Sequence, residues 1–69
     1  MLTNYYVNIN EQPTGEHEVH KDWCSRLPSI YSREFLGCFY NSDDAVKEAR
    51  KFFKIVDGCY YCSPESHRM

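Results

Sequence analysis

The run NSDDAVKEARKFFKIV (residues 41–56) carries the clearest helical pattern in the chain. Asn41 or Ser42 can cap the N-terminus of a helix, and the two aspartates that follow suit the positive end of its dipole. Six apolar side chains then fall within one arc of the helical wheel: Ala45, Val46, Ala49, Phe52, Phe53 and Val56. The pattern predicts a helix over about residues 42–54 that packs its apolar arc on a sheet.

The opposite arc of the same helix is basic, with Lys47, Arg50, Lys51 and Lys54. Such an arc could contact phosphate groups, but cations also favour the C-terminal half of a helix, and a solvated face is the ordinary interpretation. The whole chain has a net charge of −2, which argues against a protein that coats nucleic acid through bulk charge. We therefore expect any nucleic-acid binding to be weak and to depend on these four cations.

Three stretches before the helix have the character of strands. YYVNI (residues 5–9) alternates between two faces, and HEVH (residues 17–20) follows a turn that contains proline and glycine, so the two segments indicate a hairpin. EFLGCFY (residues 34–40) is apolar on both faces, which predicts the most buried strand, with Cys38 in the core and Gly37 at a bulge or close backbone approach. The fold class is therefore expected to be α+β: a small antiparallel sheet, made of the hairpin and a third strand, with one helix packed on it and a cysteine turn at the C-terminal end.

The composition is that of a globular protein, and we predict one small domain over residues 1–69 with a flexible tail at residues 63–69. Hydrophobic residues make up 42% of the chain, which argues against disorder, and no apolar stretch is long enough to span a membrane. The first residues are polar and lack the pattern of a signal peptide, so we expect a cytoplasmic protein whose thiols stay reduced. A domain of this size buries only about 60% of the surface that its unfolded chain exposes and often needs a metal or a disulfide.

Two short clips of potential metal ligands flank the third strand and the helix. VHKDWC places His20 and Cys24 with three residues between them, and GCYYC places Cys59 and Cys62 with two residues between them. One imidazole and three thiolates suit tetrahedral zinc, and each clip supplies two ligands from one turn. The pattern predicts a zinc site that links the end of the hairpin to the segment that follows the helix.

Other interpretations of these residues stay open. The cysteines could be ordinary buried thiols, because free cysteine packs as a small hydrophobic residue. His17 and His67 compete with His20 for the fourth ligand position, and a lone histidine is often a surface or capping residue. The metal could therefore be absent altogether.

The segments VHKDWC, GCFYNSDDAVKEA and GCYYC together resemble the metal-binding domain of Ada-type DNA-repair methyltransferases, within a short uncharacterised bacterial family. The resemblance covers roughly residues 19–62, with Phe39, Ser42 and Ala45 near the family's positions at the start of the helix. It implies a metal bound by the two clips. In that family the first clip position is a cysteine that accepts a methyl group, whereas this chain has His20 there, so methyl transfer is not expected to carry over.

These observations predict a non-enzymatic zinc-binding module that acts as an interaction domain. We expect a protein partner, weak nucleic-acid binding at most, and no membrane association. One alternative is a thiol–disulfide redox protein that uses Cys59 and Cys62, although that class places its cysteine pair at a helix N-terminus. The other is a metal-free α+β domain built on its aromatic core.

Overall fold

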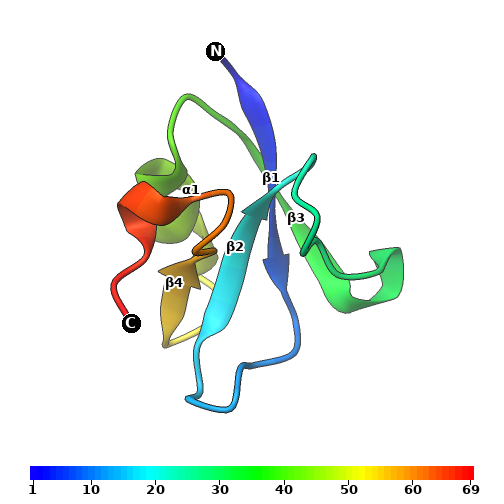
Figure 1. Ribbon diagram of the computed structural model, residues 1–69, viewed down its shortest axis with the longest axis vertical. Coiled ribbons are helices and arrows are strands. Elements are labelled where there is room, and N and C mark those ends of the chain that lie inside the picture. Colours follow the sequence, from blue (N-terminus) through cyan, green and yellow to red (C-terminus); the bar gives the residue numbers. More distant parts are fainter.

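The computed structural model describes residues 1–69 and contains one α-helix, four strands and two short 3-10 helices. The elements are β1 (Thr3–Asn8), β2 (His17–Lys21), η1 (Ile30–Ser32), β3 (Arg33–Phe39), α1 (Ser42–Ala49), β4 (Val56–Gly58) and η2 (Pro64–Ser66). The strands form a single sheet in the order β3-β1-β2-β4, and α1 contacts all four of them (Figure 1). The predicted α+β class, with one helix packed on a small sheet, is confirmed.

The sheet is mixed because β4 adds a strand that the sequence analysis did not predict. The hairpin strands β1 and β2 pair antiparallel, with Tyr6 opposite His20, and β3 pairs antiparallel with the other side of β1. The short strand β4 then pairs parallel with β2, with Val19 opposite Gly58. This parallel pairing brings the ends of β2 and β4 to the same edge of the molecule.

The strand β3 lies at the edge of the sheet, so the prediction that it is the most buried strand is wrong. Of its residues, Leu36 alone is buried, while Phe35 is exposed and packs its ring against Tyr6. Cys38, predicted to lie in the core, is exposed and donates a hydrogen bond to the side chain of Asn4. The predicted bulge is present: Gly37 has a φ of 125°, and Leu36 is an extra residue between two paired positions.

The helix α1 begins where its capping residues predict. The side-chain oxygen of Asn41 accepts a hydrogen bond from the backbone N–H of Asp44 at 2.9 Å. The helix ends at Ala49, five residues before the predicted end, and Phe52 is 61% exposed rather than packed on the sheet. The chain must leave the helix here in order to enter β4, and Phe53 instead stacks its ring on His17.

The apolar core fills the space between α1 and the sheet. It consists of Tyr5, Val7, Val19, Leu36, Ala45, Val46, Ala49 and Val56. Small alanines on the buried face of α1 let the helix lie close to the strands. The structure contains no helix that is both long enough and apolar enough to cross a membrane.

The C-terminal segment lies against α1 and β4. The hydroxyl groups of Ser42 and Ser66 are 2.6 Å apart, and the backbone N–H of Arg68 donates to the carboxylate of Asp57 at 2.7 Å. These contacts give residues 63–69 a defined position in the fold. The predicted flexibility of residues 63–69 stays a prediction.

Candidate metal centre

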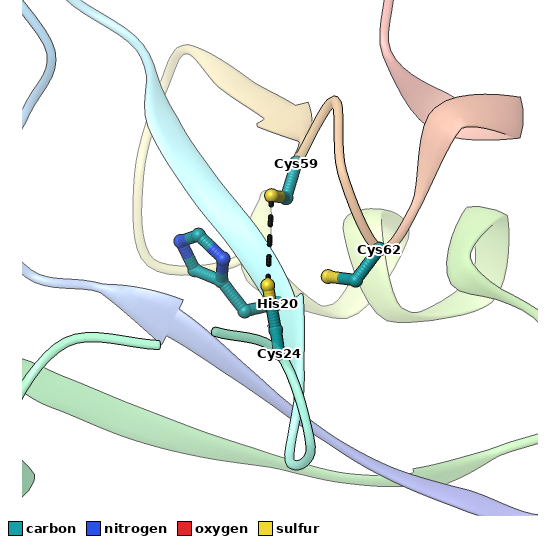
Figure 2. A group of neighbouring side chains, drawn as sticks. All are labelled: His20, Cys24, Cys59 and Cys62. Carbon is teal, nitrogen blue, oxygen red and sulfur yellow. Dashed lines mark hydrogen bonds between the residues drawn. The ribbon is translucent and has the colours of Figure 1, made fainter. Parts of the chain in front are cut away.

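The parallel pairing of β2 with β4 brings the two clips together. His20 lies on β2, and Cys24 follows in the turn that leaves this strand, where its backbone N–H donates to the carbonyl of Lys21. Cys59 comes directly after β4, and its N–H donates to the carbonyl of Val19 at 2.9 Å. Cys62 belongs to the turn after Cys59, so both clips lie at the ends of neighbouring strands (Figure 2).

Four potential ligand atoms meet in a buried cluster. One side-chain nitrogen of His20 and the sulfur atoms of Cys24, Cys59 and Cys62 all lie within 4.8 Å of one another, and none of the four residues is more than 6% exposed. The sulfurs of Cys24 and Cys59 are 3.8 Å apart, too far for a disulfide. Two thiolates bound to tetrahedral zinc at about 2.3 Å are themselves about 3.8 Å apart, so the spacing suits a shared ion.

The ring of His20 is oriented for ligation. Its Nδ1 is buried without any hydrogen-bond partner, and Figure 2 shows this nitrogen on the side of the ring that faces the sulfur atoms. The other nitrogen, Nε2, lies 3.7 Å from a carboxylate oxygen of Glu18. Burial lowers the pKa of His20 to about 4, so the imidazole is neutral at pH 7, which is the form that binds a metal. A metal ion would satisfy the nitrogen that the protein leaves unpaired.

Backbone amides point at two of the sulfur atoms. The N–H of Lys21 donates to the sulfur of Cys62 at 3.2 Å, and the N–H of Arg26 donates to the sulfur of Cys24 at 3.4 Å. Burial raises the pKa of the Cys59 and Cys62 thiols, while neighbouring amides act in the opposite direction. The thiols of these two residues are therefore protonated at neutral pH, and the amides are already placed to stabilise thiolates once a metal binds.

The structure brings together the four residues singled out in the sequence and places the competing residues elsewhere. His17 stacks on Phe53 with ring centroids 3.9 Å apart, and the Nδ1 of His67 lies 2.9 Å from the Asp57 carboxylate. Neither histidine belongs to the cluster. Glu18 and Arg26, which contact His20 and Cys24, could not be predicted from the sequence, because single charged residues carry no spacing signal.

Gly58 connects β4 to the second clip, and we predict that Gly58→Ala destabilises the domain. An added Cβ would lie 2.6 Å from the Cβ of Ser66 and 2.8 Å from the carbonyl oxygen of Ser63, which are both fixed by the backbone. Overpacking of this kind costs about 1–3 kcal/mol. Thermal or chemical unfolding of the variant measures the effect. If there were room for a methyl group at residue 58, Gly58→Ala would instead stabilise the domain, because a compatible Gly→Ala change stabilises by about 0.4–1 kcal/mol.

Comparisons with known proteins return no match. No protein-family model matches the chain, and neither a curated protein nor a solved structure matches it. The resemblance to the Ada-type metal-binding domain rests on the sequence motifs alone.

Proposed function

We propose that this chain is a small zinc-binding module in which His20, Cys24, Cys59 and Cys62 hold one structural zinc ion. The buried cluster of four donor atoms, with an unpartnered nitrogen on His20, carries the proposal. Thiolate-rich sets favour zinc over harder cations such as Mg²⁺ or Ca²⁺. Three cysteines and one histidine complete a tetrahedral set and leave no open position for a substrate, as in structural zinc sites, so we propose no catalysis.

The proposed zinc site lies in a part of the fold that the apolar core does not stabilise. The apolar core contains eight buried residues, all from the strands and α1. The segments that carry Cys24 and Cys62 lie outside this core and share only a small cluster of three cysteines with Leu27 packed against it. A metal held by both clips would join these segments to β2 and β4, and structural zinc contributes about 10–16 kcal/mol in small peptide modules.

The chemistry of the thiols favours a metal over the redox alternative. A thiol–disulfide enzyme lowers the pKa of its attacking cysteine, usually at a helix N-terminus. Here Cys59 follows a strand, and burial raises its thiol pKa together with that of Cys62. A metal-free fold would leave the buried His20 Nδ1 unsatisfied, which costs about 1–3 kcal/mol.

The resemblance to the Ada-type domain supports zinc but not methyl transfer, because His20 stands where that family has its methyl-accepting cysteine. An interaction role with a protein partner is the companion proposal. It is supported by Trp23, Tyr60 and Tyr61, which expose most of their aromatic side chains beside the cluster. Binding of nucleic acid stays the weaker alternative, because the net charge is −2.

Native mass spectrometry of protein purified without chelators tests the metal proposal. The expected result is the mass of the 8.2 kDa chain plus one zinc ion, with the ion lost under denaturing conditions. Elemental analysis of the same sample identifies the metal. A folded chain that carries no metal would overturn the proposal.

We also predict that zinc binding releases protons and weakens as the pH falls. Because burial raises the pKa of the Cys59 and Cys62 thiols, both hold their protons at neutral pH until a metal displaces them. Lower pH favours the protonated, metal-free form, so the affinity decreases; about two or more protons should leave for each zinc ion. Calorimetric titration in buffers with different protonation enthalpies counts these protons. A binding heat that does not depend on the buffer would contradict the prediction.

A further inference from the structure

A cavity of about 340 Å³ opens beside the candidate metal centre. Strand β2 contributes Glu18 and His20 to its lining, the turn after the first clip contributes Arg26, and the two residues between the paired cysteines contribute Tyr60 and Tyr61. Small-molecule sites usually measure about 300–1,000 Å³, so this cavity lies at the small end of the range. It suits a compact metabolite rather than a nucleotide or a long peptide.

Two opposite charges, Glu18 and Arg26, face this cavity, and neither forms a direct ion pair with a charged side chain of the chain. The carboxylate of Glu18 accepts a hydrogen bond from the Gln12 side chain at 3.3 Å and has no lysine or arginine within ion-pairing distance. The guanidinium of Arg26 lies over the ring of Tyr61 at 4.2 Å and has no carboxylate partner. The cavity therefore presents one carboxylate and one guanidinium, each without a direct charged partner, to a molecule that enters it.

We propose that this cavity binds a free α-amino acid in its zwitterionic form. The ligand carboxylate pairs with Arg26, whose planar guanidinium accommodates two carboxylate oxygens at once. The ligand ammonium group pairs with Glu18, and an apolar or aromatic ligand side chain packs against the rings of Tyr60 and Tyr61, which meet edge to face at 5.4 Å. Only a molecule that carries both charges can pair with Arg26 and Glu18 at the same time.

The proposal rests on the proposed metal site, because the two clips shape the cavity. The backbone N–H of Arg26 donates to the sulfur of Cys24, and Tyr60 and Tyr61 are the residues enclosed between Cys59 and Cys62. The ring of His20 forms part of the lining. Metal binding would hold these walls in place, so amino-acid binding requires the metal-loaded protein.

The test is an NMR titration of the full zinc-loaded chain with three probes. They are L-phenylalanine, N-acetyl-L-phenylalanine, which lacks the ammonium charge, and L-phenylalanine amide, which lacks the carboxylate. We expect saturable shifts of the backbone amides of Glu18, Arg26, Tyr60 and Tyr61 with L-phenylalanine up to about 10 mM, and affinities at least about tenfold weaker for the other two probes.

Substitutions of the chain complete the experiment. Arg26→Gln and Glu18→Gln should each weaken L-phenylalanine binding at least about tenfold. Arg50→Gln is the matched control, because Arg50 is an exposed residue directly after α1 and does not line the cavity. It should bind the probe as the unchanged chain does.

Zinc content, measured for every sample, separates this proposal from the metal proposal. A chain that holds one zinc ion but shows no saturable shifts at the cavity overturns the amino-acid site and leaves the metal site intact. Equal binding of a singly charged probe, or unchanged binding by both cavity variants, also overturns it. A chain without zinc overturns the metal proposal first and the cavity proposal with it.

Discussion

Replacing Cys59 with serine is expected to abolish zinc binding and to leave most of the chain unfolded at room temperature. Cys59 is the first ligand residue of the second clip and comes directly after β4, and its sulfur lies 3.8 Å from that of Cys24. A serine hydroxyl keeps its proton at neutral pH and is not among the ligands that zinc sites use. Structural zinc contributes about 10–16 kcal/mol in small modules, whereas the net stability of a 69-residue domain is about 3–10 kcal/mol. Loss of the whole metal contribution would therefore match or exceed the net stability of the domain.

The exposed Cys38 provides a matched control. Cys38→Ser makes the same chemical change outside the cluster, and a serine hydroxyl can keep the hydrogen bond to the Asn4 side chain. Zinc content and circular-dichroism melting of the two variants, with the unchanged chain before and after chelation, give the comparison. We expect Cys38→Ser to retain one zinc ion and the melting temperature of the unchanged chain. We expect Cys59→Ser to bind no zinc and to be mostly unfolded already at room temperature. Cooperative unfolding of Cys59→Ser at the original temperature would show that the cluster does not stabilise the fold through a metal.

The two clips, with their three cysteines, can be identified in the sequence because the signal is local. Each clip places two donor atoms within a single turn, and that spacing survives whatever the rest of the chain does. The choice of His20 over His17 and His67 was not local. It depends on β4 pairing parallel with β2, which puts His20 beside the cysteines and leaves the other two histidines at Phe53 and Asp57.

The wrong prediction for β3 and the missed strand β4 have one physical cause. The residues of β3 are apolar on both faces, which resembles a central strand, but position within a sheet is set by pairing with distant segments. In the structure β3 pairs only with β1, so Phe35 covers Tyr6 at the surface and Cys38 stays exposed. A three-residue strand such as β4 is also too short to show a period of its own.

The predicted end of α1 is wrong for a related reason. The apolar arc continues through Phe52, Phe53 and Val56, so the helical period alone gives no stop. Pairing of Val56 with His17 in the sheet competes with helix continuation and requires the chain to turn after Ala49. The backbone N–H of Phe52 then bonds to the carbonyl of Ala49, three residues back, which tightens the last turn.

Replacing Ala49 with aspartate should unfold the domain even when zinc is supplied. Ala49 is completely buried in the core between α1 and the sheet, together with Val46 and Val56. An aspartate there places a carboxylate among apolar side chains, with no cation in the core to pair with it. An uncompensated buried charge costs about 3–5 kcal/mol, which is comparable with the whole stability of such a domain. Thermal melting and tryptophan fluorescence of the zinc-treated variant measure the loss.

Two further variants separate charge from size and helix propensity. Ala49→Asn adds nearly the same volume without a charge and should be less destabilising than Ala49→Asp. Lys47→Asp puts the same side chain on the exposed face of α1 and should change the stability by less than about 1 kcal/mol. A cooperative Ala49→Asp variant with unchanged melting would contradict the packing of α1 on the sheet.

If Ala49→Asp unfolds while Cys59→Ser does not, the apolar core alone sustains the fold. If both unfold, neither the core nor the metal is sufficient, which is the result expected when eight buried residues share a small domain with a four-ligand site.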